Sequence, residues 1–259
     1  MPIFRRNDLR LIQPDWPMTK SVKAYTTTRI GDGSRPPFDG FNLAMHVGDD
    51  PRQVLANRQH LAEVLALPTE PYWLDQLHTD IVVKASNINV EDAIPQADAS
   101  WTDEPNRVLA VMTADCLPLL VSDVSGKMVA AIHAGWKGLL NGIIPKTIAH
   151  LPVSNDQLRV WIGPAIGRQY FEVGTEVYEA FMAADQRYQP FLTQQPVNPL
   201  KWLVNLPGLA EFQLNQCHIA TVFQSQLCSY HQADWFYSYR RDGQTGRMAS
   251  LIWIEDKTD

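Results

Sequence analysis

The order of apolar and polar positions predicts strands at several points along the chain. The β-branched run SVKAYTTTRI (21–30) predicts a strand, and YWLDQLHTDIVVKAS (72–86) has the same character. Residues 107–133 are expected to form a strand, a turn and a second strand, and 158–167 a strand that runs into a Gly-Pro loop. The run DWFYSYRRDGQTGRMASLIWI (234–254) predicts a closing hairpin, because two β-rich halves flank a turn that contains glycine.

Helical spacing of apolar residues predicts four helices between these strands, over 51–67, 138–151, 175–185 and 206–216. Pro51 would lie in the first turn of its helix, where proline is favoured. Pro145 must kink its helix or delay its start. Because helices mix with hairpins and with crossover connections, the pattern favours a mixed α/β fold over a purely parallel sheet.

Two apolar runs within 107–133 place a cysteine and a histidine where they could meet. The turn formers in SDVSGK centre the turn between residues 124 and 125. In the register that follows, Cys116 faces His133, and opposed Cβ atoms lie about 4.5–5.5 Å apart. Such a pair suits two ligands of one zinc ion, or a Cys–His ion pair that lowers the pKa of the thiol. A buried cysteine beside a histidine with a structural role is the alternative.

A third ligand is needed to complete such a site, because a catalytic zinc ion usually has three protein ligands and one open position. The candidates are the other histidines: His46, His60, His78, His150, His218 and His231. His78, in LDQLHTD, is favoured because it precedes a strand-like run, where a loop could turn its side chain inward.

Composition narrows the classes of function. The chain has 259 residues, with 22 basic and 28 acidic side chains and a net charge of -6. Nucleic-acid binding needs a basic face and is not expected, but a local basic pocket for a small anion stays open. Neither a membrane span nor the apolar core of a signal peptide is expected from the sequence. Three cysteines make a poor disulfide framework, so we expect a cytoplasmic location.

The residues around the expected ligands match the signature blocks of a known family. QLH (76–78), TADCLPLLV (113–121) and HAGWKGL (133–139) resemble the three blocks of the laccase-domain (YfiH-like) family. TTRIGDGSRPPFDGFNLAMHVGDDP, GPAIGRQYFEVG and FYSYRRDGQTGRMAS resemble further blocks in the same order, so the resemblance covers nearly the whole chain. It implies a single mixed α/β domain over residues 1–259, with layered mixed β-sheets flanked by helices.

The resemblance also implies metal ligands and an activity. The family's three zinc ligands, which would also be the catalytic residues, fall on His78, Cys116 and His133, with copper as the alternative metal. Members of the family were first described as multicopper polyphenol oxidases and are regarded as purine nucleoside phosphorylases with adenosine deaminase activity. The implied reaction converts adenosine, inosine, guanosine or methylthioadenosine and phosphate to the free base and ribose 1-phosphate.

The sequence departs from the family pattern near the site. Lys137 stands where the family usually has arginine, which keeps the charge but loses the bidentate fork. Leu77 and Thr79 replace the usual neighbours of the first ligand, and Asn205 occupies a position that is often aspartate. None of these changes removes a metal ligand, so they bear on substrate preference.

Two arginines and two loop residues are candidate contacts for substrate and phosphate. Arg58 falls within the apolar face of the first predicted helix, so it must pair with an acid or serve the phosphate. Arg240 and Arg241 end a predicted strand and would point to opposite faces, and Arg240 is the one expected to enter the site. Asn42 and His46 could hydrogen-bond ribose or base, or stabilise their own turns.

Three other functions stay open for the same residues. Cys116 could be the nucleophile of a hydrolase or amidase, activated by His133. A copper-dependent polyphenol oxidase is weaker, because a multicopper site needs more ligands than seven scattered histidines readily supply. A structural zinc module would need a fourth protein ligand.

Overall fold

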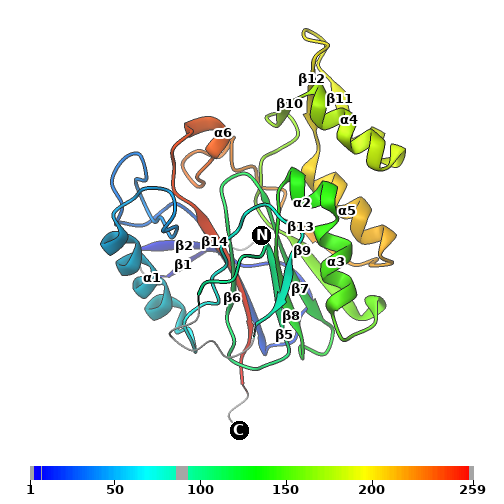
Figure 1. Cartoon of the computed structure of the whole chain (residues 1–259). Coiled ribbons are helices and arrows are strands. Elements are labelled where there is room, and N and C mark those ends of the chain that lie inside the picture. The colour runs from blue at the N-terminus through cyan, green and yellow to red at the C-terminus, as the bar shows by residue number, and fades with distance from the viewer. Residues whose placement is uncertain (1–2, 7, 86–92, 257–259) are drawn as a thin grey trace.

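The computed structural model describes residues 3–6, 8–85 and 93–256, and it has sheets in the middle and helices outside (Figure 1). The mixed α/β class predicted from the sequence is confirmed. In chain order, the elements are β1 (Ile3–Arg6), β2 (Leu9–Ile12), β3 (Val22–Thr27), α1 (Pro51–Leu65), β4 (Val82–Lys84), β5 (Ala99–Thr102), β6 (Leu109–Thr113), β7 (Leu117–Asp123), β8 (Val129–Ala134), α2 (Trp136–Asn141), α3 (Ile143–His150), β9 (Leu158–Ile162), β10 (Glu172–Gly174), α4 (Thr175–Ala184), β11 (Leu192–Gln194), β12 (Lys201–Val204), α5 (Leu206–Gln216), β13 (Val222–Gln224), α6 (Tyr239–Asp242) and β14 (Met248–Ile254), with short 3-10 helices at Asn155–Gln157 and Gln186–Phe191.

Two sheets form the centre of the molecule. One has the strand order β1-β2-β3-β14-β6 and is antiparallel throughout. The other has the order β13-β9-β7-β8-β5-β4 and is antiparallel except at its two edges, where β13 and β4 run parallel to their neighbours. A small third sheet, β10-β12-β11, projects with α4 at the top of Figure 1.

Alternation of side chains along the strands divides the core into layers. On β7, Leu119 and Val121 pack in the cluster that includes the residues of α2, α3 and α5, whereas Leu120 packs between the two large sheets. On β6, Val111 joins that layer between the sheets, and Met112 packs on the opposite side with residues of α1. The layers therefore run from α1 through the two sheets to α2, α3 and α5 (Figure 1).

Several predicted elements have different bounds in the structure. The helix expected over 138–151 is two helices, because Gly142 adopts φ +83° between them and Pro145 lies in the first turn of the second. Only Val82–Lys84 of the strand expected over 72–86 pairs as a strand, and Ser86 lies outside the described residues. The closing hairpin is wrong: 234–247 contains turns and α6, and only β14 is a strand.

The hairpin of β7 and β8 forms, but the predicted register is wrong. Pro118, rather than Cys116, pairs with His133. The turn closes one residue later than expected, because Gly126 adopts φ +68° and the Asp123 carboxylate accepts the backbone N–H groups of the turn. Cys116 therefore lies two residues from the position opposite His133, and a shift of two keeps both side chains on one face of the sheet.

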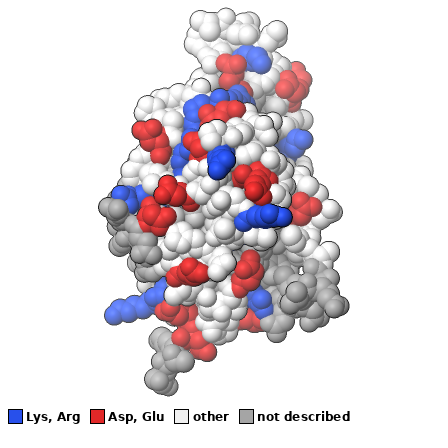
Figure 2. Space-filling model, turned by 90° about the vertical axis from the view of Figure 1, so that its left-hand side faces the viewer, with Lys and Arg blue, Asp and Glu red and all other residues white. Residues whose placement is uncertain are grey.

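Acidic and basic side chains are interspersed on the face shown in Figure 2. In the part of the chain that the structure describes, no helix has the length and apolar character that crossing a bilayer requires.

Asp123 should stabilise the β7–β8 turn in a pH-dependent way. Its carboxylate accepts the N–H groups of Ser125, Lys127 and Met128 at 3.1, 2.7 and 2.9 Å, so Asp123→Ala should lower the free energy of unfolding by about 2–4 kcal/mol at pH 7. Burial raises the pKa of Asp123, but hydrogen bonds outweigh it and lower the pKa. The stabilisation is therefore present above the unfolded pKa of about 4 and is lost as the pH falls below it.

Urea titrations of wild type and Asp123→Ala at pH 7 and pH 3 measure this effect. Asp156→Ala, in the short 3-10 helix Asn155–Gln157 and exposed, is the control and should change stability by less than about 0.5 kcal/mol. An Asp123→Ala protein as stable as wild type at pH 7 would show that the turn does not depend on this carboxylate.

Candidate functional site

Three side chains that are far apart in the sequence meet at one end of the space between the two large sheets. His78 comes from the loop before β4, Cys116 from the link between β6 and β7, and His133 from the end of β8. Their donor atoms lie within 4.8 Å of one another, and Cys116 Sγ is 3.6 Å from His78 Nε2. Within the described residues no fourth cysteine, histidine or carboxylate joins this cluster, so an ion held by these three side chains would have a fourth position free of protein ligands.

Asp98 holds two of the three ligands in place. Its carboxylate is fully buried and accepts the Nδ1–H of His133 at 2.7 Å, which leaves Nε2 of that ring as the donor atom toward the cluster. The same carboxylate accepts the backbone N–H groups of His78 at 3.1 Å and Thr79 at 2.5 Å. His78 has φ +59°, and these two hydrogen bonds stabilise that turn. A carboxylate that fixes a histidine ring in this way is typical of metal sites.

Gly135 leaves the space in which the ligands approach one another. A Cβ atom at this position would lie 2.7 Å from His78 Cδ2 and 3.0 Å from Cys116 Sγ, so only glycine fits without moving both. The donor set of one thiolate and two imidazoles suits zinc, and copper ions also bind these groups. The residues present therefore fit a metal ion.

The charges within the cluster favour a thiolate beside an imidazolium. Burial by itself raises the pKa of Cys116, but the charge of His133 and hydrogen bonds from both histidines outweigh it and lower the pKa to about 6. Burial likewise lowers the pKa of His133, but the Cys116 thiolate and Asp98 outweigh it and raise the pKa to about 9. Each of the two charges thus favours the other when no metal is bound.

The cluster lines a cavity of about 440 Å³. The apolar part of its wall comes from several elements and includes Met112, Trp136, Ile166, Phe171 and Leu206. Arg240 and Arg247 add two guanidinium groups, and neither forms an ion pair with any carboxylate among the described residues. Burial lowers the pKa of Arg247, although the charges of Cys116 and Asp115 oppose that shift.

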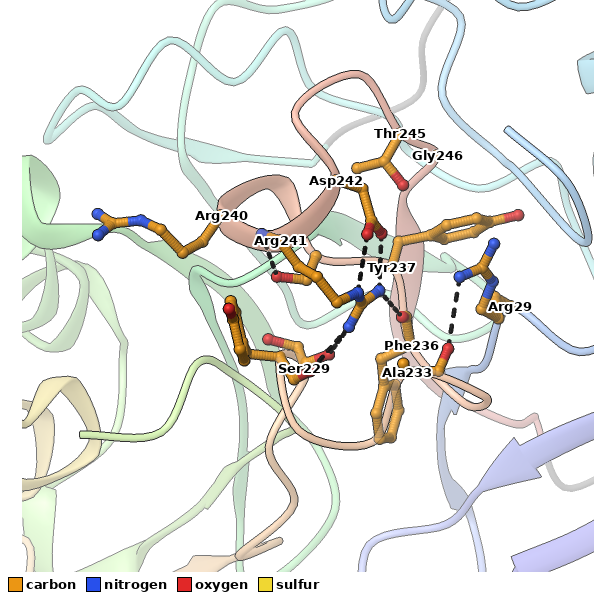
Figure 3. A network of polar contacts seen from close by, with 12 residues as sticks. Arg29, Ser229, Ala233, Phe236, Tyr237, Arg240, Arg241, Asp242, Thr245 and Gly246 are labelled. Atoms are coloured by element: carbon orange, nitrogen blue, oxygen red, sulfur yellow. Dashed lines mark hydrogen bonds and ion pairs between the residues drawn. The ribbon is translucent and has the colours of Figure 1, made fainter. Parts of the chain in front are cut away.

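Arg240 lines the cavity as expected, but for a different reason. Arg240 and Arg241 belong to α6 rather than to the end of a strand, so the predicted alternation of faces is wrong. Their side chains leave this short helix in opposite directions (Figure 3). Arg240 donates to the carbonyl oxygen of Glu172 at 2.5 Å and lies 5.3 Å from the ring centroid of Phe171.

Arg58 lies behind the cavity wall. Its Nε donates to the carbonyl of Leu43 at 2.9 Å, its guanidinium stacks 3.9 Å from the ring centroid of Trp73, and Nη2 is 4.0 Å from Met112 Sδ. No carboxylate in the described ranges forms an ion pair with it, and burial lowers its pKa to about 10. Desolvation and the charges of Arg247 and Arg58 lower the pKa of His46.

Asn42 is fully buried in its own loop. Its amide donates to Asp49 and to the carbonyl of Ala44, and its oxygen accepts the N–H groups of Ala44 and Arg247. The structure thus places Asn42 behind Arg247 rather than on the cavity wall.

Three residues that shape the site were not predicted from the sequence: Asp98, Asp115 and Arg247. Asp98 precedes a buried strand and is surrounded by alanine and serine, and an acid in so apolar a setting is a signal that could have been used. Asp115 and Arg247 lie in quoted blocks, but their position at the cavity depends on contacts between distant segments.

Cys116 should react as a thiolate near neutral pH. Because its pKa is lowered to about 6, alkylation of the metal-free protein by iodoacetamide should reach half its maximal rate near pH 6. His133→Asn removes the imidazolium, so the midpoint should move toward about 8.5, which lowers the thiolate fraction at pH 7 about 30-fold. Cys116→Ser gives the background from Cys217 and Cys228. A wild-type midpoint above pH 8 would contradict this electrostatic coupling.

Gly135 should be required for tight metal binding. Gly135→Ala keeps all three ligands and a backbone φ of -77° that alanine accepts, but its Cβ would collide with His78 and Cys116. We expect the Kd for zinc to rise by at least about tenfold in competition titrations with a chelator. Gly138→Ala, where the nearest atom is 3.3 Å from the added Cβ, is the control and should bind as wild type does. Equal zinc affinity in Gly135→Ala and wild type would contradict the conclusion that His78 and Cys116 approach each other beside Gly135 to bind one ion.

Several known proteins resemble this chain in sequence and in fold. The family model described as "Multi-copper polyphenol oxidoreductase laccase" matches residues 23–255. The "Purine nucleoside phosphorylase YfiH" of Escherichia coli (strain K12) is 43% identical over 245 residues, which cover 95% of this chain and 99% of the relative. The "Purine nucleoside phosphorylase" of Haemophilus influenzae is 41% identical over 249 residues, which cover 95% of this chain and 100% of the relative.

Solved structures agree over the same length. The crystal structure of a Neisseria meningitidis protein matches with a TM-score of 0.89 and 39% identity, covering 95% of this chain and 99% of that one. The structure of YlmD from Geobacillus stearothermophilus matches with a TM-score of 0.85 and 28% identity, covering 98% of this chain and 99% of that one. The resemblance seen in the sequence is confirmed, and the chain belongs to the multi-copper polyphenol oxidoreductase laccase family.

Proposed function

We propose that this protein is a zinc-dependent purine nucleoside phosphorylase, which cleaves the bond between a purine and ribose with phosphate. One observation carries the proposal: a single cavity holds a His-Cys-His cluster and two arginines without carboxylate partners among the described residues. Relatives that are 41–44% identical over nearly their whole length carry the name purine nucleoside phosphorylase.

Each part of the cavity has a role in this reaction. Arg240 and Arg247 hold the phosphate by charge-assisted hydrogen bonds. Trp136 and Tyr239 supply aromatic faces against which a purine can stack. Met112 and its apolar neighbours exclude water, which would otherwise compete with phosphate for C1′ of the ribose. The positive charge that develops on ribose as the purine leaves is stabilised by the phosphate that Arg240 and Arg247 place beside it.

The metal is assigned to the three converging side chains. His78, Cys116 and His133 would hold zinc, which when bound supplies a Lewis acid that stabilises developing negative charge. Asp98 keeps the His133 ring in the orientation that binding needs. Copper binding, phenol oxidation and adenosine deamination stay predictions for the same cluster.

The other predicted contacts act from behind the cavity wall in this proposal. Arg58 adds to the positive potential around Arg247, and desolvation together with the charges of both arginines lowers the pKa of His46, which favours its neutral imidazole as a hydrogen-bonding group. The side-chain oxygen of Asn42 accepts a hydrogen bond from the backbone N–H of Arg247 at 2.9 Å and so fixes the position of the Arg247 backbone.

A cysteine-centred hydrolase is the second candidate. Cys116, His133 and Asp98 form a chain of thiolate, imidazolium and carboxylate, which is the arrangement that activates a nucleophilic cysteine. Removal of the metal distinguishes the two functions. A phosphorylase of the proposed kind loses its activity on chelation and regains it with zinc, whereas a cysteine hydrolase keeps or gains activity when the thiolate is free.

The test is phosphate-dependent release of base. Wild-type protein loaded with zinc should convert inosine or adenosine and phosphate to free base and ribose 1-phosphate, measured by chromatography. Cys116→Ala should lose bound zinc and reduce the rate at least about 100-fold. Cys217→Ala, a half-buried cysteine at the end of α5, is the matched control and should keep both. Wild-type protein with full zinc content that releases no base would refute the proposed function.

A further inference from the structure

Asp115 lies next to the ligand Cys116, and donors occupy both of its carboxylate oxygens. Oδ1 accepts the hydroxyl of Ser229 at 2.6 Å. Oδ2 accepts the hydroxyl of Ser238 at 3.0 Å and the backbone N–H of Arg240 at 2.7 Å. Asp115 is a buried residue of the cavity wall. Both of its carboxylate oxygens nevertheless accept hydrogen bonds from residues 229–240, the segment that carries Arg240, and so point toward that segment rather than into the cavity.

The backbone around Asp115 fixes the direction of this carboxylate. β6 ends at Thr113 in one sheet and β7 begins at Leu117 in the other, so Asp115 lies in the link that crosses between the sheets. It has φ +95°, which a residue with a side chain rarely adopts, and its carbonyl accepts the N–H of Ile166 at 2.9 Å. The link that places Cys116 in the metal cluster therefore also aims Asp115 at α6.

Arg241 also stabilises the segment 229–242, through contacts that do not involve Asp115. The guanidinium of Arg241 donates to the carbonyls of Ser229 and Phe236, each at 2.9 Å, and pairs with Asp242 at 2.7 Å (Figure 3). Ser238 connects Asp115 with Arg241, because its hydroxyl donates to the Asp115 carboxylate and accepts the backbone N–H of Arg241 at 3.2 Å. With α6 fixed in this way, the side chain of Arg240 is left pointing away from the network (Figure 3).

We propose that Asp115 is a positioning residue that sets where Arg240 stands relative to the metal cluster, and hence how tightly phosphate binds. This inference rests on the proposed function in one respect, namely that Arg240 contacts phosphate. Asp115 does not transfer protons in this scheme, because both oxygens already accept hydrogen bonds. It links the metal-binding motif TADC to the motif YRRD, which is more than 120 residues away along the chain.

A double-mutant cycle on phosphate binding tests the proposal without using turnover. Inorganic phosphate is titrated by calorimetry into zinc-loaded wild type, Asp115→Asn, Arg240→Gln and the double variant. Asp115→Asn keeps the size of the side chain but places an amide where donors need an acceptor, so the Kd for phosphate should rise about tenfold. The double variant should bind no more than about twofold more weakly than Arg240→Gln alone, because Asp115 acts through Arg240.

Zinc content and a milder variant separate positioning from loss of structure. All variants should keep the zinc stoichiometry of wild type. If Asp115→Asn does not fold, Ser238→Ala removes one of the donors and should raise the Kd about threefold, again without effect in the Arg240→Gln background. A merely structural role would instead lower zinc content or weaken phosphate binding equally in both backgrounds.

Three results would overturn the inference: unchanged phosphate affinity in Asp115→Asn, weakening that adds in full to that of Arg240→Gln, or a wild type that binds no phosphate. Failure of the proposed function looks different. A wild type that binds phosphate through Arg240 and releases no base from nucleosides would refute phosphorolysis and leave the role of Asp115 standing.

Discussion

The hydrogen bond between the buried carboxylate of Asp98 and the ring of His133 is the interaction on which the site depends. A desolvated charge is costly unless donors surround it, and here the donors are a ligand's ring and the backbone of the loop that carries a second ligand. Burial raises the pKa of Asp98, but these contacts outweigh it and lower the pKa, so the carboxylate stays charged. The groups that stabilise Asp98 are thus the same groups that it holds in position for a metal.

The topology brings these groups to one place. β5 and β8 are antiparallel neighbours, so Asp98, just before β5, lies beside His133, near the end of β8. β7 is the other neighbour of β8, so Cys116, just before β7, reaches the same end of the sheet. The ends of the strands therefore supply a thiolate, an imidazole and the carboxylate that orients it, while the sheets themselves remain apolar.

Sequence patterns predicted the strands of the core and the convergence of Cys116 with His133. The convergence was predicted correctly because side chains alternate between the two faces of a strand with a period of two residues. The register was wrong by two residues, which preserves the face of each side chain, whereas a slip of one would have separated them. The strand expected from 234 onward failed because Phe236 and Tyr237 are buried in a turn-rich segment rather than paired in a sheet. The role of Asp98 was not predicted, because its partners His78, Thr79 and His133 lie in other segments of the chain and no local sequence pattern relates them to it.

The central claim, that one thiolate and two imidazoles share a single ion, is tested most directly by X-ray absorption at the zinc edge of the loaded protein. The expected spectrum contains one sulfur at about 2.3 Å, two imidazole nitrogens at about 2.0 Å and one further light atom that is not a protein ligand. A coordination shell without sulfur, or one closed by a fourth protein side chain, would contradict it.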